Sequence, residues 1–256
     1  MAKGMLELVA LRPFAHSVGT VDAGQKFLVP KTFGDELVRA GLATSKAPQG
    51  RWQGGTAVAM ASGPSLTAED VEAVRAWRAA GAGRYVGVTN TTFRSALWAD
   101  LLYAADKKWW DAYHTEVRAT FTGELWTQDD AARKHYGIRH VQCEQRFGLS
   151  RIAGVVHNGG NSGHQLVGLL ANQGVRKIIL LGYDMQLTNG AAHHHGDHPK
   201  PLRQNTAFDT WRRNFRELAL DAKTAGIELL NATRITALPW VPRIALELAL
   251  VGSDNG

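Results

Sequence analysis

The chain has 256 residues, of which 45% are hydrophobic and 20% charged, and its formal net charge at pH 7 is +6. This composition is typical of a globular protein and excludes a disordered or collagen-like chain. No apolar run reaches the roughly 18 to 20 residues of a membrane-spanning helix, and a single cysteine, Cys143, excludes an internal disulfide. We therefore expect a cytoplasmic protein without a membrane span. The positive charge favours acidic partners such as nucleotides, nucleic acid or polyanionic glycans.

Residues 1–45 are predicted to form a small accessory unit with a β-β-α pattern. Residues 6–11 and 25–29 have the pattern of strands, and residues 33–40 have that of a short helix. The unit is too small to bury much apolar surface alone, so it is expected to pack on a neighbour. A stretch rich in Gly, Pro and polar residues follows at 44–55 and has the composition of a linker.

Residues 56–256 are predicted to form a second domain with a Rossmann-like α/β fold. Strand and helix patterns alternate along this region, and such alternation favours a doubly wound parallel sheet with helices on both faces. The expected strands are 56–60, 84–89, 119–122, 137–143, 177–181 and 227–231, and the expected helices are 68–80, 109–117, 129–136, 164–173 and 208–225. Residues 96–105 fit either a helix or a strand followed by a loop.

The strongest active-site candidate follows the apolar strand at 177–181. Asp184 and a histidine-rich loop that contains His195, Asp197 and His198 come directly after this strand. Ligands of open α/β sheets bind at the carboxyl ends of the strands. A histidine here could act as a general base, because imidazole titrates near neutral pH. Alternatively, His195, Asp197 and His198 are candidate metal ligands with Asp184 nearby, or the loop is merely solvated.

A second candidate is the segment at 61–66, which lies between the first strand of the domain and a helix. Backbone amides and the helix dipole make such a junction a ready phosphate site. Gly63 would let an anion approach the backbone, Pro64 would stiffen the turn, and Ser65 would add a hydroxyl. Asn90, at the end of the next strand, could hold a base or ribose. An ordinary turn explains both features equally simply.

Tryptophans cluster in the middle third of the chain, at positions 98, 109, 110 and 126. They could stack on a sugar or a base. Packing in the core or at an interface is the commoner role of such residues, so we expect them to be structural.

Five motifs in fixed order resemble those of a known family. They are A-S-G-P-S-L (61–66), V-T-N-T-T-F (88–93), N-S-G-H-Q-L-V-G-L-L-A (161–171), I-I-L-L-G-Y-D-M (178–185) and N-A-T-R-I-T-A-L (231–238). Together they resemble motifs of bacterial CMP-sialic-acid-dependent sialyltransferases, of motility-associated glycosyltransferase-like proteins and of a pterin pyrophosphokinase family. The resemblance spans residues 56–240. It implies a Rossmann-like fold and the transfer of a sugar from a CMP- or UDP-type nucleotide sugar.

The resemblance also implies roles for individual residues. The nucleotide, with its phosphate or sugar, would be bound by Gly63, Pro64, Ser65, Asn90, Ser162 and Gly163. Asp184 would brace the site. A histidine within 193–198 would be the general base, and we favour His195 and His198. The chain departs from the family at Ala61, where the family has glycine, and in its run of three histidines, which leaves a divalent metal open.

Two further functions compete with sugar transfer. The N-terminal unit resembles short segments of bacteriophage head and morphogenesis proteins, so the chain could be a non-catalytic, virion-associated protein that reuses the fold. The acidic and histidine side chains could instead serve a metal-dependent nucleotidyl or pyrophosphoryl transferase. The expected partners are a nucleotide-sugar donor and an acceptor on a glycan, DNA or protein. Phage structural proteins and a second copy of the chain are further candidate partners.

Overall fold

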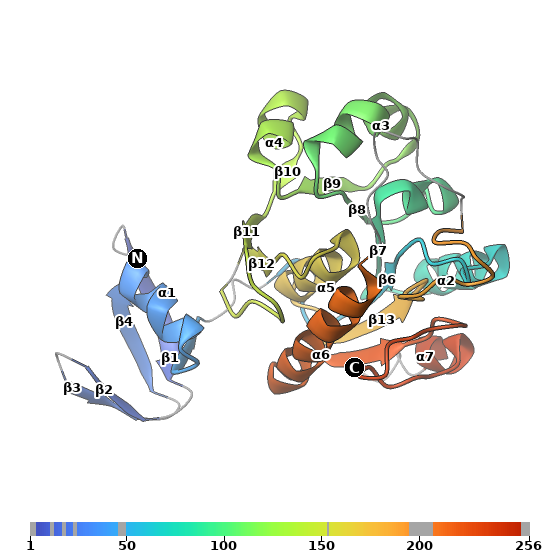
Figure 1. The fold of residues 1–256 in the computed structure, drawn as a ribbon. Helices are drawn as coiled ribbons and strands as arrows, with labels where there is room; N and C mark the ends of the chain where they lie inside the picture. Colours follow the sequence, from blue (N-terminus) through green and yellow to red (C-terminus); the bar gives the residue numbers. More distant parts are fainter. Residues whose placement is uncertain are drawn as a thin grey trace.

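The computed structural model describes residues 4–10, 13–16, 19–22, 25–45, 50–152, 154–194 and 207–251. Its main feature is a seven-stranded sheet with the order β10-β9-β8-β7-β6-β13-β14, in which every pair of neighbours is parallel (Figure 1). The strands are β6 (Thr56–Met60), β7 (Arg84–Thr89), β8 (Leu101–Tyr103), β9 (Glu124–Thr127), β10 (Arg139–His140), β13 (Lys177–Leu181) and β14 (Glu228–Asn231). This architecture confirms the predicted Rossmann-like α/β fold.

The strand order reverses between β6 and β13. The chain builds outward from β6 to β10 on one side, then returns to place β13 beside β6 on the other. The carboxyl ends of two strands at such a reversal leave a crevice in which α/β proteins bind ligands. The crevice between β6 and β13 is therefore the expected position of a site.

Helices cover both faces of the sheet, and they are α2 (Ala68–Ala79), α3 (Lys107–Thr120), α4 (Asp130–Tyr136), α5 (Ser162–Asn172), α6 (Phe208–Thr224) and α7 (Leu246–Val251). Alternate residues of the buried strands serve two cores. Ile179 and Leu181 pack in the core that includes side chains of α2, α3 and α7, whereas Ile178 and Leu180 pack with α5 and α6. Because both faces are covered, the central strands are mainly apolar, with polar residues at their ends.

Most of the predicted elements of this region are confirmed, but several places differ. The expected strand at 137–143 is divided between β10, at the edge of the main sheet, and β11 (Gln142–Glu144), which pairs in parallel with the unpredicted strand β12 (Val155–His157). The expected strand at 119–122 is wrong, because α3 continues to Thr120 and the next strand is β9. Val117 and Phe121, four positions apart, pack in the same core, which favours the helix. Residues 96–105 form a loop and the strand β8, and α7 has no counterpart among the predicted elements.

The N-terminal unit contains more than the predicted β-β-α pattern. Its antiparallel sheet has the order β4-β1-β5, and its elements are β1 (Met5–Ala10), β2 (Phe14–His16), β3 (Gly19–Val21), β4 (Lys26–Pro30), α1 (Lys31–Arg39) and β5 (Ala43–Ser45). Leu8, Leu37 and Val38 form a small core with Ile152 and Val155 of the larger region. This shared core fits the expectation that the unit packs on a neighbour. Of the predicted linker, residues 46–49 lie outside the described residues.

Candidate functional site

A cleft of about 710 Å³ lies at the carboxyl edge of the sheet, where the strand order reverses. The loops after β6, β7, β8 and β13 line it, together with the start of α5. Its polar and charged lining includes Ser62, Asn90, Lys107, Lys108, Ser162 and His193. Of the predicted site residues, the structure brings five together in the cleft, namely Gly63, Asn90, Ser162, Gly163 and Asp184.

Two glycines bring the loops after β6 and β13 into direct contact beneath the cleft. The Gly63 amide donates to the Gly182 carbonyl at 2.8 Å. A Cβ atom at Gly63 would overlap Asp184 Oδ1 and the Gly182 carbonyl oxygen. Gly182 has a φ of +73°, which favours glycine. The absence of a side chain at residue 63 therefore allows two protein loops to pack, whereas the sequence had suggested the approach of an anion.

Asp184 braces this floor from a buried position. Its carboxylate accepts hydrogen bonds from the Ser65 amide at 3.0 Å, from the Ser65 hydroxyl at 2.8 Å and from the Thr188 hydroxyl at 2.8 Å. A carboxylate with three internal donors holds the loops together. The geometry therefore fits the implied bracing role, and it argues against Asp184 as a catalytic acid or metal ligand.

Ser65 and Pro64 are placed differently from the prediction. Ser65 is buried, and its hydroxyl, besides bonding Asp184, accepts a hydrogen bond from the Ile235 amide at 3.3 Å. Neither residue lines the cleft. The amide of Ser65 and that of Leu66, which donates to the Gly63 carbonyl at 3.1 Å, are both used within the protein. The segment 61–66 is thus mainly a structural turn.

The starts of two other helices form further walls of the cleft, and the wall at α3 carries both signs of charge, since Asp106, Asp111 and Asp129 line it beside Lys107 and Lys108. Asn161 caps α5 by accepting the His164 amide at 2.9 Å, and Ser162 and Gly163 form the first turn. The first amides of a helix have no partners within it and favour anions. Lys107 and Lys108 begin α3 on another wall. Because Lys107 pairs with Asp111 at 2.6 Å, Lys108 is the more available cation.

Two residues of the cleft have a backbone conformation that is rare for their type. Asn90 has a φ of +47° and Met185 a φ of +53°. Asparagine tolerates this left-handed region, whereas for methionine it is unusual. The Met185 carbonyl accepts a hydrogen bond from Arg212 at 3.1 Å, which helps to hold the conformation. Such residues concentrate at functional sites.

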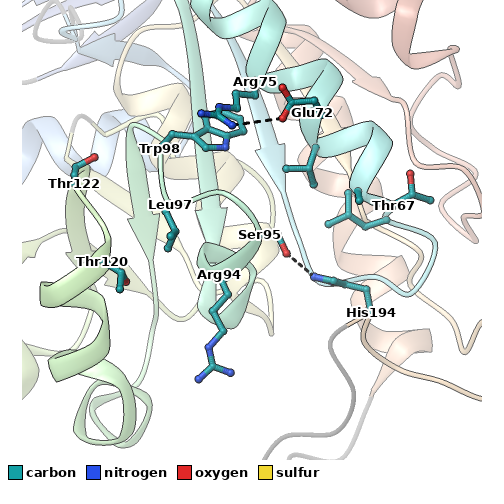
Figure 2. A pocket seen from close by; sticks show the side chains of 13 residues that line it. Thr67, Glu72, Arg75, Arg94, Ser95, Leu97, Trp98, Thr120, Thr122 and His194 are labelled. Carbon is teal, nitrogen blue, oxygen red and sulfur yellow. Dashed lines mark hydrogen bonds and ion pairs between the residues drawn. The ribbon is translucent and has the colours of Figure 1, made fainter.

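Two consecutive histidines point to opposite sides of their loop. His193 lines the cleft, and its Nδ1 lies 2.8 Å from the Ser62 hydroxyl. His194 lines a second pocket, where its Nε2 lies 3.1 Å from the Ser95 hydroxyl (Figure 2). The His194 amide donates to the Ser62 carbonyl at 2.9 Å and fixes this arrangement. Burial lowers the pKa of His194, which is therefore held neutral.

The favoured histidines are not among the residues that the structure places. His195, Asp197 and His198 lie outside the described residues, so neither their catalytic role nor their metal role is addressed by the geometry. Within the described ranges, no three His, Cys, Asp or Glu side chains gather as a metal site. His193 is the histidine that the structure places in the cleft. No sequence signal distinguished it, because its partner Ser62 lies 131 positions away.

The motif at 231–238 holds the backbone that follows β13. The Thr233 hydroxyl accepts the Tyr183 amide at 2.9 Å, and the Thr236 hydroxyl donates to the Tyr183 carbonyl at 2.8 Å. The Ala237 amide donates to the Asp184 carbonyl at 2.8 Å. These bonds fix the backbone after β13 where it enters the cleft, so this motif is scaffolding.

The clustered tryptophans are mainly structural, as expected. Trp109 and Trp110 belong to the core, and Trp98 packs against it while lining the second pocket. Trp126 is half-buried beside the other core. Cys143 is also half-buried, and burial raises the pKa of its thiol to about 11, so it is not a reactive thiolate at neutral pH.

No protein-family model matches the chain, and no curated protein is significantly similar to it. Among the helices that the structure describes, none combines the length and the apolar character that crossing a membrane requires.

Proposed function

We propose that the protein transfers a sugar from a nucleotide-sugar donor to an acceptor hydroxyl in the cleft between β6 and β13. The observation that carries the proposal is His193, which is hydrogen-bonded to Ser62 in a cleft walled by two helix starts. A histidine base in the same cleft as the start of α5, whose first amides favour an anion, is what such a transfer needs. The order of motifs along the sequence supports the same activity.

In this proposal, the donor phosphate binds at the start of α5, near Ser162 and Gly163. The helix dipole favours a negative charge there, and Lys108 adds a cation from the start of α3. The Asn90 amide offers a donor and an acceptor for the base or ribose. The donor is of the CMP or UDP type.

Ser62 would set the tautomer of His193, the proposed general base. When His193 donates its Nδ1 proton to the Ser62 hydroxyl, the lone pair of the neutral ring is on Nε2. Nε2 takes the proton of the acceptor hydroxyl while the acceptor oxygen bonds to the anomeric carbon. The bond between that carbon and the phosphate oxygen breaks, and its electron pair leaves with the nucleotide. Ser62 continues to accept from Nδ1 as the imidazolium forms.

Calorimetric titration with CMP, CDP, UMP and UDP, with and without Mg²⁺ or Mn²⁺, tests the donor site. We expect one nucleotide to bind, and its affinity to fall about tenfold in Asn90→Gly and in Lys108→Ala. Glycine is chosen at position 90 because it tolerates the positive φ. The exposed Lys223→Ala is the matched charge control and should bind normally. Absence of binding by all four nucleotides would contradict the proposal.

The role of His193 as the general base is tested by measuring the release of nucleotide from a nucleotide sugar whose nucleotide binds in the titration. We expect His193→Gln to lower kcat at least a hundredfold with unchanged nucleotide affinity, because a positioned base contributes about 10²–10⁴-fold. Ser62→Ala should lower kcat less and change its pH profile, because the tautomer is no longer fixed. If His193→Gln keeps full activity, another residue is the base.

The same experiments separate the two other candidate functions. Nucleotide binding that requires Mg²⁺ or Mn²⁺ would favour nucleotidyl or pyrophosphoryl transfer. Failure to bind any nucleotide, together with stable association with phage head or tail proteins, would favour the virion-associated role.

A further inference from the structure

The second pocket, of about 730 Å³, lies across residues 193–194 from the cleft. It is bounded by the first turns of α2, by the 3-10 helix η1 (Asn90–Ser95) with the residues after it, and by the end of α3. Figure 2 shows Thr120 and Thr122 on one side of the pocket and Thr67 on the other. It also shows the hydrogen bond between Ser95 and His194. No step of the transfer proposed above uses this pocket.

The lining of this pocket combines three kinds of group. Leu66 and Val71 form an apolar floor, and Leu97 is 39% exposed at its edge. Trp98 packs one part on the core and lines the pocket with the rest. Four hydroxyl side chains line the pocket, namely Thr67, Ser95, Thr120 and Thr122, and the first three already bond the Asp70 amide, the His194 ring and the Glu116 carbonyl. An aromatic surface with surrounding hydroxyls is suited to a sugar ring, which has an apolar face and a polar edge.

The charged side chains that line the pocket are Glu72, Arg75 and Arg94. Arg94 is neutralised by two hydrogen bonds of 2.7 Å to Glu116. Arg75 forms an ion pair of 3.7 Å with Glu72, and because both side chains are largely exposed, at 59% and 69%, a ligand carboxylate can replace Glu72 at Arg75. A carboxylate is the natural partner of such a guanidinium.

We infer that this pocket binds an acidic sugar, a uronic-acid-type ring that packs on Trp98 and pairs its carboxylate with Arg75. The further assignment of this sugar as part of the acceptor rests on the proposed function. It follows from the position of the pocket, because His194 lines the pocket while the adjacent His193 holds the base in the cleft. An acceptor of two or more sugar units would place one unit here and extend its terminal hydroxyl past the loop to His193.

Binding of methyl β-D-glucuronide, followed by saturation-transfer NMR and calorimetry, tests the inference, with methyl β-D-glucoside as the neutral match. We expect the glucuronide to bind at least tenfold more tightly than the glucoside. Arg75→Gln should remove this preference, and Trp98→Leu should weaken both sugars. The exposed Arg213→Gln is the charge control and should bind as the wild type. Melting temperatures identify any variant that fails to fold, and Arg75→Gln is expected to fold normally because the side chain is exposed.

The outcomes distinguish this inference from the proposed function. Equal binding of the two sugars, or glucuronide binding that is lost in the cleft variant Asn90→Gly and kept in Arg75→Gln, would overturn the acidic-sugar pocket. Arg75-dependent glucuronide binding without any nucleotide affinity would keep the pocket and overturn its role in transfer. Nucleotide binding without glucuronide binding would overturn the pocket alone.

Discussion

Acid should destabilise this protein through His164, a buried histidine at the start of α5. The ring packs edge-on to Phe215, with centroids 5.5 Å apart, and a Cβ atom on Gly159 would overlap it. Neither ring nitrogen has hydrogen-bonding geometry to a partner among the described residues. Burial lowers the pKa of His164 to about 3; the charge of the nearby His157 lowers it further by a smaller effect, and the His157 backbone opposes both.

The magnitude follows from linkage between protonation and folding. The unfolded chain binds a proton at His164 below about pH 6.5, whereas the folded protein does so only near pH 3. Stability is therefore fully present above pH 6.5 and is lost progressively as the pH falls towards 3. Each pH unit below 6.5 removes about 1.4 kcal/mol of unfolding free energy, so at pH 4.5, two units lower, the loss from this residue is about 2.7 kcal/mol.

Urea unfolding at pH 7.5 and 4.5 measures the effect against His164→Leu, which keeps a similar volume without a titratable group. Wild type and His164→Leu lose the same stability through their carboxylates at low pH, so this loss cancels when the two proteins are compared. We expect wild type to lose about 2.7 kcal/mol more than the variant, and His164→Leu to be at least as stable at pH 7.5, because two unpaired buried nitrogens are removed. The same substitution at the exposed His135 should leave acid sensitivity unchanged. Equal acid losses in wild type and His164→Leu would refute the reasoning.

Three further predictions concern the floor of the cleft and the cysteine. Gly63→Ala should lower the unfolding free energy by about 2–4 kcal/mol, because the new methyl group overlaps Asp184. The control Gly81→Ala, whose new methyl group meets only the flexible end of a side chain, should cost less than about 1 kcal/mol. Urea unfolding compares the two variants, and equal losses would contradict the overlap at Gly63. Asp184→Asn should lower the unfolding free energy, measured in urea, by about 1–3 kcal/mol, because hydrogen bonds to a charged carboxylate are lost. Unchanged stability would contradict the bracing role of Asp184. Cys143 should react with iodoacetamide at pH 8 at least tenfold more slowly in the folded protein than in urea, because burial raises its pKa to about 11; equal rates would show that the thiol is accessible and ionised.

The fold was predictable because its signals are local. The apolar run at 177–181 predicted β13, and the structure has this strand. The start of α2 is likewise fixed by neighbouring residues, because Thr67 and Asp70 form its capping box. The extent of α3 was not predictable, because the segment at 119–122 suits a strand by composition. Only the core that receives Phe121 decides in favour of the longer helix.

The site was less predictable, because its geometry joins distant parts of the chain. Sequence reasoning could place Gly63 and Asp184 at the same sheet edge, but it could not show that they pack against each other. The partner of Ser65 is likewise 119 positions away, which is why its hydroxyl suggested a phosphate contact. Among several adjacent histidines, only the fold reveals that His193 meets Ser62.

The opposed directions of His193 and His194 make Ser62 a shared support of both pockets. Its hydroxyl lies 2.8 Å from the His193 ring in the cleft, and its carbonyl accepts the amide of His194, whose ring lines the second pocket. A shift of the loop after β6 at this one residue would therefore move the lining of the cleft and of the second pocket together.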